Sequence, residues 1–316
     1  MSVFIAKRVL TLLATLIGAS IVIFLVMEIL PGDPALVILG VDASDEAVRA
    51  LTIELGLDRP PLERYWDWMT GILTGELGNS YAYKVPVWEL VEGALLITIP
   101  LALMSIALSI VLALSIGLYA AANHNKAGDI TLMGISQLGI SVPNFWLAIL
   151  LIILFAIELR WLPAGGFPGW KDGIWVCLKA LLLPSLALAT VVGAILARIT
   201  RSSVLEVFRE DYVRTARAKG LSQQATLWRH VLRNALIPVL TVTGIQFSAL
   251  LTGTVVVENV FHIPGLGSLV LKAINNRDTI VVENVVLLLA TMIIVVNFVV
   301  DILYAVIDPR LKAHDI

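Results

Sequence analysis

The sequence predicts an all-α, polytopic membrane protein, because the chain is far more apolar and far less charged than a soluble protein of its length. Of its 316 residues, 59% are hydrophobic and only 15% are charged, against about a quarter charged in a typical soluble domain. A helix that crosses the hydrocarbon needs about 20 mostly apolar residues. Six segments meet this requirement and predict six transmembrane helices: residues 9–27, 95–121, 132–157, 180–197, 237–257 and 285–307.

The distribution of Lys and Arg orients these spans, because loops rich in both stay in the cytoplasm. Segment 198–236 decides the orientation, because it contains eight basic residues and only three acidic ones. The acidic residues are Glu206, Glu210 and Asp211, and the basic residues are Arg198, Arg201, Arg209, Arg214, Arg217, Lys219, Arg229 and Arg233. With this segment inside, the inner loops hold more than half of the 22 basic residues and a quarter of the 24 acidic ones. We therefore expect the N and C termini to be cytoplasmic.

The first apolar segment is expected to remain in the mature protein as a span. Its apolar run of roughly 19 residues exceeds the 7–15 residues usual in a signal peptide, and no small-x-small cleavage site follows it. The segment that comes next, 28–94, is acidic and is predicted to be external. It opens with a Pro-Gly-Asp-Pro turn at 31–34, and two short helices are expected over 43–56 and 62–74.

The function of this external segment stays open between two compatible interpretations. Its Trp and Tyr residues could anchor it at the headgroup level, or the segment could form a small cap at the outer mouth of a pore. Two further loops, 158–179 and 258–284, are also predicted to be external. The first is rich in Pro and Gly, and the second should turn at 263–267 and continue as a short helix.

The basic segment 198–236 carries a helical pattern rather than the composition of a simple connector. Leu205, Phe208, Tyr212 and Ala216 follow one another at helical spacing, so a helix is expected to begin at Ser202 or Ser203. Gly220 is placed to end it in a left-handed conformation. Ser222 can cap a second helix whose apolar side would hold Ala225, Trp228 and Leu232. Two interpretations remain: a rigid corner that docks a soluble partner, or a helix lying among the headgroups.

The chain lacks the motifs of several other functional classes. It contains no G-x-x-x-x-G-K-[ST] phosphate loop, no H-E-x-x-H and no G-x-S-x-G. The four histidines lack metal-ligand spacing, and the lone Cys177 has no disulfide partner in the chain. No basic patch interleaved with aromatic residues suggests a nucleic acid. We expect a protein that is not an enzyme and binds no cofactor or metal.

Ionisable groups are rare within the predicted spans. Asp301 lies in the last one, with Asn297 one turn earlier on the same face. The pair could belong to a translocation path or to a contact between subunits, or it could simply bond to a neighbouring helix. An ion-coupled secondary carrier is the alternative function, but such carriers need several buried carboxylates and internal repeats, and neither is seen here.

The run RTARAKGLSQQATLWRHVLRNALIP resembles the cytoplasmic signature loop of ABC-importer permeases, in the dipeptide/oligopeptide/nickel form. Gly220 takes the place of the signature glycine and Ala216 that of its second alanine. Arg214 replaces the Glu of the general pattern and Arg233 its Pro, as in the peptide/nickel subgroup. Further motifs of the B-type permease follow in order along the whole chain: PGDPA, ELGLDRP, GELGNSY, SVPNFWLA, LPAGG, VFHIPGLG and IDPRL.

The resemblance implies a multi-pass permease of the bacterial inner membrane with a type I ABC importer fold. Residues 1–316 would form one transmembrane permease domain, with 28–94 as its external segment and 198–236 as its cytoplasmic coupling loop. The family's function is import of a small peptide or similar solute, driven by ATP. The solute class stays open among dipeptides, oligopeptides, opines, glutathione, nickel chelates and oligosaccharides.

The resemblance also implies a set of partners. These are a second homologous permease subunit, two cytoplasmic ABC ATPase subunits that bind ATP and Mg, a periplasmic or lipid-anchored solute-binding protein, and membrane lipid. The residues expected to contact the ATPase are Arg214, Thr215, Ala216, Arg217, Lys219 and Gly220.

Overall fold

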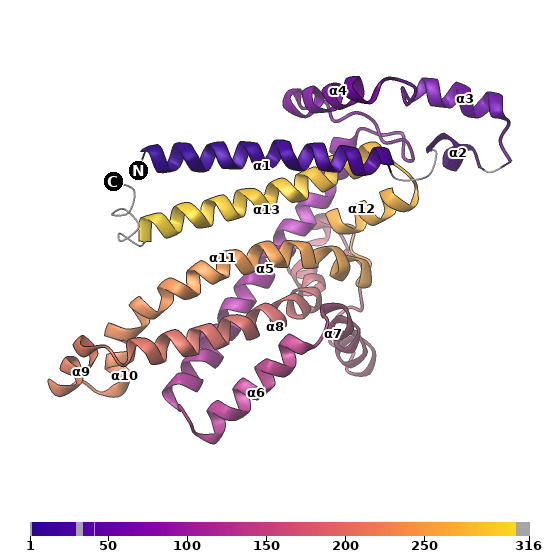
Figure 1. Ribbon diagram of the computed structural model, residues 1–316. Coiled ribbons are helices and arrows are strands. Elements are labelled where there is room, and N and C mark those ends of the chain that lie inside the picture. Colours follow the sequence, from indigo (N-terminus) through magenta and orange to yellow (C-terminus); the bar gives the residue numbers. More distant parts are fainter. Residues whose placement is uncertain (1, 30–33, 41, 308–316) are drawn as a thin grey trace. The chain divides into compact units, whose positions relative to one another are not determined.

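The computed structural model describes residues 2–29, 34–40 and 42–307, and these residues are overwhelmingly helical (Figure 1). Five long apolar helices could each cross a membrane: α1 (Ser2–Ile29), α5 (Val87–Ala122), α8 (Ile174–Val207), α11 (Leu232–Val260) and α13 (Thr279–Ile307). A bent pair of helices would make the sixth span. The predicted all-α polytopic fold is confirmed.

The third predicted span, 132–157, is built from two helical parts rather than one continuous helix. The structure has α6 (Ala127–Ser141), then α7 (Asn144–Leu151) continued by a π-helical stretch (Ile152–Glu158), and the two parts meet at an angle of 106°. Pro143 explains the break, since proline lacks an N–H and disfavours the helical conformation of the residue before it. Val142 is accordingly extended, with φ −90° and ψ 124°.

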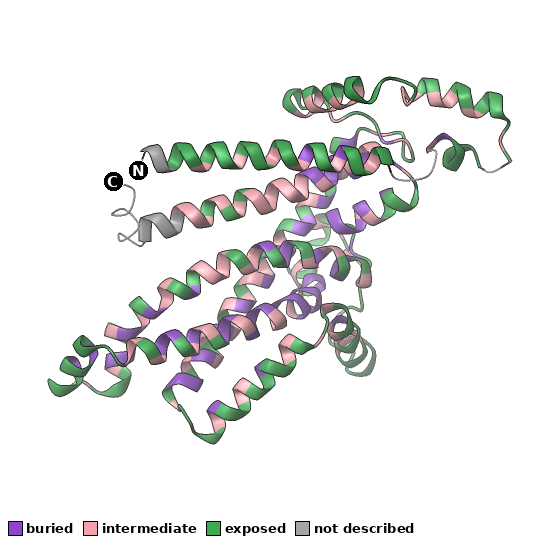
Figure 2. Ribbon diagram, viewed as in Figure 1, coloured by how far each residue is buried: buried purple, intermediate pink, exposed green. Residues whose placement is uncertain are grey.

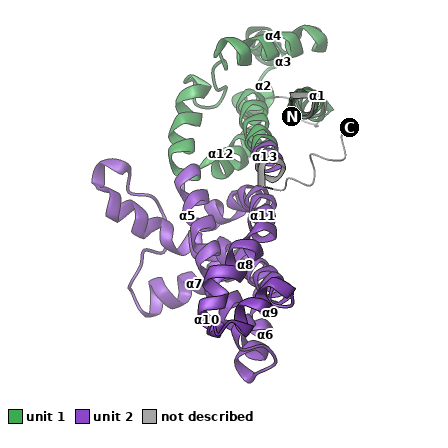
Figure 3. Cartoon of the chain, turned by 90° about the vertical axis from the view of Figure 1, so that its left-hand side faces the viewer, with its two compact units in different colours: residues 1–98, 264–295 green, residues 99–263, 296–316 purple. Residues whose placement is uncertain are grey.

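The chain divides into two compact units, and the boundaries between them fall within α5 and α13 (Figure 3). The first holds residues 1–98 and 264–295, and the second holds 99–263 and 296–316. In the first unit, the short helices are α2 (Pro34–Leu39), α3 (Asp45–Glu54), α4 (Pro61–Thr74) and α12 (Leu266–Asn275). They confirm the helices predicted over 43–56 and 62–74 and the short helix after the turn at 263–267.

Local signals account for the ends of these short helices. The Ser44 hydroxyl accepts a hydrogen bond from the Ala47 N–H and so caps α3, while Gly75 ends α4 at a φ of 82°. Most of the predicted turn at 31–34 lies outside the described residues, as does nearly all of the closing IDPRL motif. The core of this unit joins the start of α5 to α12 and α13 through buried aliphatic residues: Val87, Val91, Ala94, Leu266, Val270, Ala273, Val281, Val282 and Val285.

In the second unit, α8 is the central helix. Of its most apolar stretch, 72% is buried, against 33% or less for the other four long helices. It packs against α6, α7 and α11 and lies very close to α5, because a Cβ on Gly117 would be 2.6 Å from the Thr200 Cβ. By contrast, α1 exposes most of its apolar surface (Figure 2), as a helix in contact with lipid would.

Candidate functional site

The basic segment folds as a sharp corner at the ends of two long helices of the second unit. Helix α8 ends at Val207, and α9 (Asp211–Ala218) and α10 (Gln223–Thr226) follow. A π-helical turn (Leu227–Val231) then leads into α11. We call α9, α10 and the turn between them the corner, residues 211–226. It projects past the ends of α8 and α11 (Figure 1).

The turn of the corner has the geometry predicted at Gly220. Its φ is +91°, a left-handed conformation that glycine adopts without a steric penalty. The Gly220 N–H donates to the Arg217 carbonyl at 2.9 Å, and the Leu221 N–H donates to the Ala216 carbonyl at 3.4 Å. The predicted cap of the second helix is also present, since the Ser222 hydroxyl accepts from the Ala225 N–H at 3.3 Å.

The start of the first predicted helix and the buried face of the second differ from the expectation. Ser202 and Ser203 lie inside α8 and do not begin a new helix, because the chain first turns at 208–210, where Glu210 is extended. In the second helix, Trp228 is exposed and its neighbour Leu227 is buried. The π-helical turn causes this shift, because its i→i+5 hydrogen bonding rotates the side chains away from ideal α-helical positions.

An apolar underside anchors the corner to the ends of the long helices. Val213 of α9 is fully buried and packs in a cluster with Leu227, Val231, Val204 of α8 and Ala121 of α5. A hydrogen bond adds to this packing, since the Asn234 amide of α11 donates to the Tyr212 hydroxyl at 2.6 Å. The corner is therefore attached to three helices and can move only together with them or by breaking this core.

The outer side of the corner is exposed and basic. Among the residues expected to contact an ATPase, all but one are exposed: Arg214, Thr215, Arg217, Lys219 and Gly220. Ala216 is the exception, because it is 7% exposed and lies on the buried face. Arg214 makes a long contact of 3.5 Å with Asp211, in which both side chains are largely exposed, and such pairs contribute little to stability. The guanidinium groups are thus available to a partner.

Asn297 and Asp301 lie on α13, apart from the corner in sequence. The Ser248 hydroxyl of α11 donates a hydrogen bond to the Asn297 carbonyl oxygen at 2.9 Å, so Asn297 bonds to a neighbouring helix. Its side chain is nevertheless exposed, and Asp301 one turn later is half-buried. The two residues share one side of α13, as their spacing predicts.

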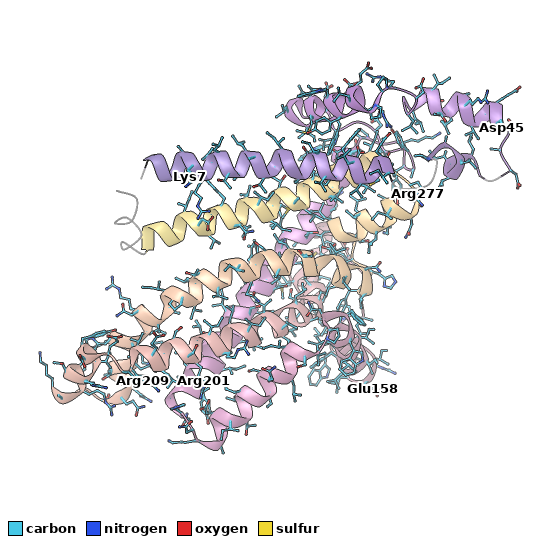
Figure 4. The ribbon with its side chains drawn as sticks, in the orientation of Figure 1. Lys7, Asp45, Glu158, Arg201, Arg209 and Arg277 are labelled. Carbon is cyan, nitrogen blue, oxygen red and sulfur yellow. The ribbon has the colours of Figure 1, made fainter. Side chains whose placement is uncertain are left out.

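An ion pair between α6 and α8 was missed by the sequence reasoning. By sequence, Arg201 is one of the eight basic residues of segment 198–236, yet its guanidinium bonds to the buried carboxylate of Asp129, 72 residues earlier. Figure 4 marks Arg201 near the end of α8. The available signal was weak: Asp129 is the only acidic residue between Asn123 and Ser141. Within the described residues, no group of three or more His, Cys, Asp or Glu side chains could hold a metal ion.

Comparison with known families gives two matches that together cover nearly the whole chain. Residues 113–313 match the family model described as "Binding-protein-dependent transport system inner membrane component". Residues 1–102 match the corresponding N-terminal model of a binding-protein-dependent transport system membrane component.

Individual relatives and solved structures agree with these matches. The chain is 40% identical to the dipeptide transport system permease protein DppB of Alkalihalophilus pseudofirmus, over 97% of this chain and 98% of the relative. It is also 40% identical to the glutathione transport system permease protein GsiC of Salmonella choleraesuis, over 98% of each. The inward-facing MetNI methionine ABC transporter is similar in fold, with a TM-score of 0.59 at 17% identity, over 70% of this chain and 97% of that one.

Proposed function

Since the chain belongs to the family of binding-protein-dependent transport system inner membrane components, we propose that it encloses half of a translocation path beside a second, homologous permease subunit. The protein is a multi-pass inner-membrane permease subunit of an ABC importer. We expect the N and C termini in the cytoplasm, the whole chain acting as one permease domain, 28–94 as its external segment and 198–236 as its coupling loop.

The corner is the proposed docking site for a cytoplasmic ATPase. One observation carries this proposal: α9 presents an exposed basic side while its opposite side is buried in a core shared with three long helices. Arg214, Arg217 and Lys219 can pair with carboxylates of a partner, and the buried Val213 passes any displacement of the corner to the spans. Rigid, packed elements transmit motion in this way.

The energy would come from two partner ATPases, which bind ATP and Mg, while this chain has no catalytic role and binds no cofactor. The absence of a G-x-x-x-x-G-K-[ST] motif supports this division. The few ionisable groups within the predicted spans support ATP-driven rather than ion-coupled transport.

A small peptide is the proposed solute, delivered by a periplasmic or lipid-anchored binding protein on the external side. The relatives named above support it, because their names give a dipeptide and glutathione as the transported solutes. Asn297 and Asp301 are proposed to line the path or to contact the second permease subunit, since one is exposed and the other half-buried on the same side of α13.

The docking role is tested by reversing charge on the corner. In Arg214→Glu/Arg217→Glu we expect the ATPases to be lost from purified membranes, because two attractions become repulsions, while insertion of the permease stays normal. Lys126→Glu is the matched control, since Lys126 is exposed on the loop before α6, outside the corner. ATPase association that survived the double reversal would argue against the docking role.

The solute and the partner set are tested by uptake into proteoliposomes. The full set of two permeases, ATPases and binding protein should import a labelled dipeptide with ATP, and unlabelled glutathione or dipeptide should compete. Equal uptake by the chain alone would contradict an ATP-driven importer. Uptake of only sugars or metal chelates would contradict the proposed solute class.

A further inference from the structure

The contact between Arg201 and Asp129 has the geometry of a strong, directional link. The Arg201 Nε donates to Asp129 Oδ1 at 2.5 Å, and a terminal nitrogen of Arg201 donates to Oδ2 at 2.7 Å. Two parallel, charge-assisted hydrogen bonds hold distance and orientation together. The Asp129 side chain is only 2% exposed, so removing Arg201 would leave a buried carboxylate without its counter-charge.

The loop before α6 holds the carboxylate in place for this link. The Asn125 N–H donates to Asp129 Oδ2 at 2.9 Å, with Asn125 in a left-handed conformation at φ 62°. The His124 ring lies at the same oxygen, with Nδ1 3.4 Å away, and 3.0 Å from an Arg201 nitrogen. Asp129 also lies in the first turn of α6, where a negative charge is stabilised by the helix dipole. The anchor point on α6 is thus rigid.

The two ends of the link belong to different functional parts of the second unit. Arg201 lies on α8, six residues before that helix ends and the chain enters the corner. Asp129 lies at the base of α6, the helix that leads to the 106° break at Val142 and Pro143. Beyond the break, Asn144 approaches α11, because a Cβ on Gly253 would be 3.4 Å from the Asn144 amide nitrogen.

Away from the ion pair, α6 is held on one side only. Its other side exposes large apolar residues such as Ile130, Ile135 and Leu138. Higher on the helix, a Cβ on Gly139 would lie 3.6 Å from Thr190 of α8, an ordinary van der Waals contact distance. The salt bridge differs from this packing because it joins α6 and α8 by two directed hydrogen bonds.

We propose that the Arg201–Asp129 pair is a positioning clamp that makes the broken span follow the corner, so that movement of the docked ATPases reaches α6 and the break above it. The proposal rests on the docking function of the corner. Arg201 and Asp129 act through the helices that they join and touch neither nucleotide nor solute. Without the clamp, the ATPases would still dock and hydrolyse ATP, but α6 would lag behind α8 and fewer solute molecules would be imported per ATP.

The measurement is the ratio of peptide imported to ATP hydrolysed, in proteoliposomes with the complete complex. Arg201→Gln and Asp129→Asn should lower this ratio by roughly two- to thirty-fold, the range of measured effects on coupling, with the ATPases still bound. Arg198→Gln is the matched control, since Arg198 lies one turn earlier on α8, is exposed and has no ion pair within the described part of the chain. A clamp that only stabilised the fold would lower uptake and ATP hydrolysis together and leave the ratio unchanged.

A reversible cross-link removes any ambiguity from misfolding of the single variants. In a Cys177→Ser background, Asp129→Cys/Arg201→Cys would be joined by a short bis-methanethiosulfonate reagent and then released with a reductant. The ratio should be near wild type while cross-linked and fall on release in the same preparation, and the Cys177→Ser protein alone should not respond. An unchanged ratio on release would overturn the clamp. Failure of the wild-type complex to import with ATP would instead overturn the proposed function on which the clamp rests.

Discussion

Gly165 lies directly against the main chain of Phe261. A Cβ at residue 165 would be 2.4 Å from the Phe261 carbonyl oxygen, and the next N–H, that of Gly166, donates to the same oxygen at 2.7 Å. Phe261 is fully buried. Gly165 belongs to the LPAGG motif and Phe261 to the VFHIPGLG motif. These two motifs, nearly 100 residues apart in sequence, therefore pack against each other at a point where only a glycine fits.

The first prediction follows from this close approach. Gly165→Ala should destabilise the protein by about 1–3 kcal/mol, the usual cost of overpacking, because the carbonyl that the new methyl would meet is backbone and cannot rotate away. The loss of stability is measured by thermal unfolding in detergent. Gly134→Ala is the control, since a Cβ on Gly134 of α6 would meet no atom within 4 Å. It should be neutral or slightly stabilising, and equal losses in both variants would contradict the argument.

The second prediction concerns the left-handed residue of the corner. Gly220→Ala should cost about 1 kcal/mol or somewhat more, because a Cβ disfavours positive φ, although the surrounding space is open. Trypsin should then cleave faster at the basic residues of α9, and ATPase association should weaken. The stability of Gly220→Asn should lie between those of the wild type and Gly220→Ala, since asparagine tolerates positive φ better than alanine does. Identical behaviour of the Ala and Gly proteins would show that the turn is not left-handed in solution.

The third prediction concerns Asp278, a buried carboxylate that links the loop before α5 to the start of α13 through hydrogen bonds. Asp278 is fully buried and accepts hydrogen bonds from the Ser80 hydroxyl at 2.5 Å and from the Ala82 N–H at 3.1 Å, both through Oδ2. Asp278→Asn should destabilise the protein by about 1–3 kcal/mol, because bonds to a charged acceptor are among the stronger ones. The thermal midpoint measures this, and the exposed Asp58→Asn should leave it unchanged.

The fourth prediction is a pH dependence at Tyr81. Burial, helped by the negative charge of Glu283, raises the pKa of Tyr81 from 10 to about 12. The folded state therefore holds the phenol proton more tightly than the unfolded state, and the associated stability is complete below about pH 10 and is lost as the pH rises toward 12. From about pH 9 to about pH 11, the wild type should lose stability relative to Tyr81→Phe. Parallel curves for the two proteins would contradict the buried, neutral phenol.

The sequence predicted most of the helices, because local signals specify them. Apolar runs marked the long helices, Gly220 marked the end of α9 and Ser222 marked the start of α10. The size of the break at Pro143 in the third span could not be predicted, because proline in a membrane helix can produce a mild kink or a full break, depending on which neighbours satisfy the freed backbone groups. The shifted face at Trp228 was missed because a π-helical turn leaves no clear mark in composition.

By itself, the sequence determined that this protein is a helical membrane protein, how many apolar segments could span, and where the corner turns at Gly220. These properties depend on hydrophobic transfer and on backbone preferences of a few neighbouring residues. Only the tertiary structure decided that Arg201 pairs with Asp129, that Gly165 must accommodate the Phe261 carbonyl, and that Ala216 faces inward while Arg217 faces outward. Each of these depends on distances between segments far apart in the chain, which are set by the packing of whole helices.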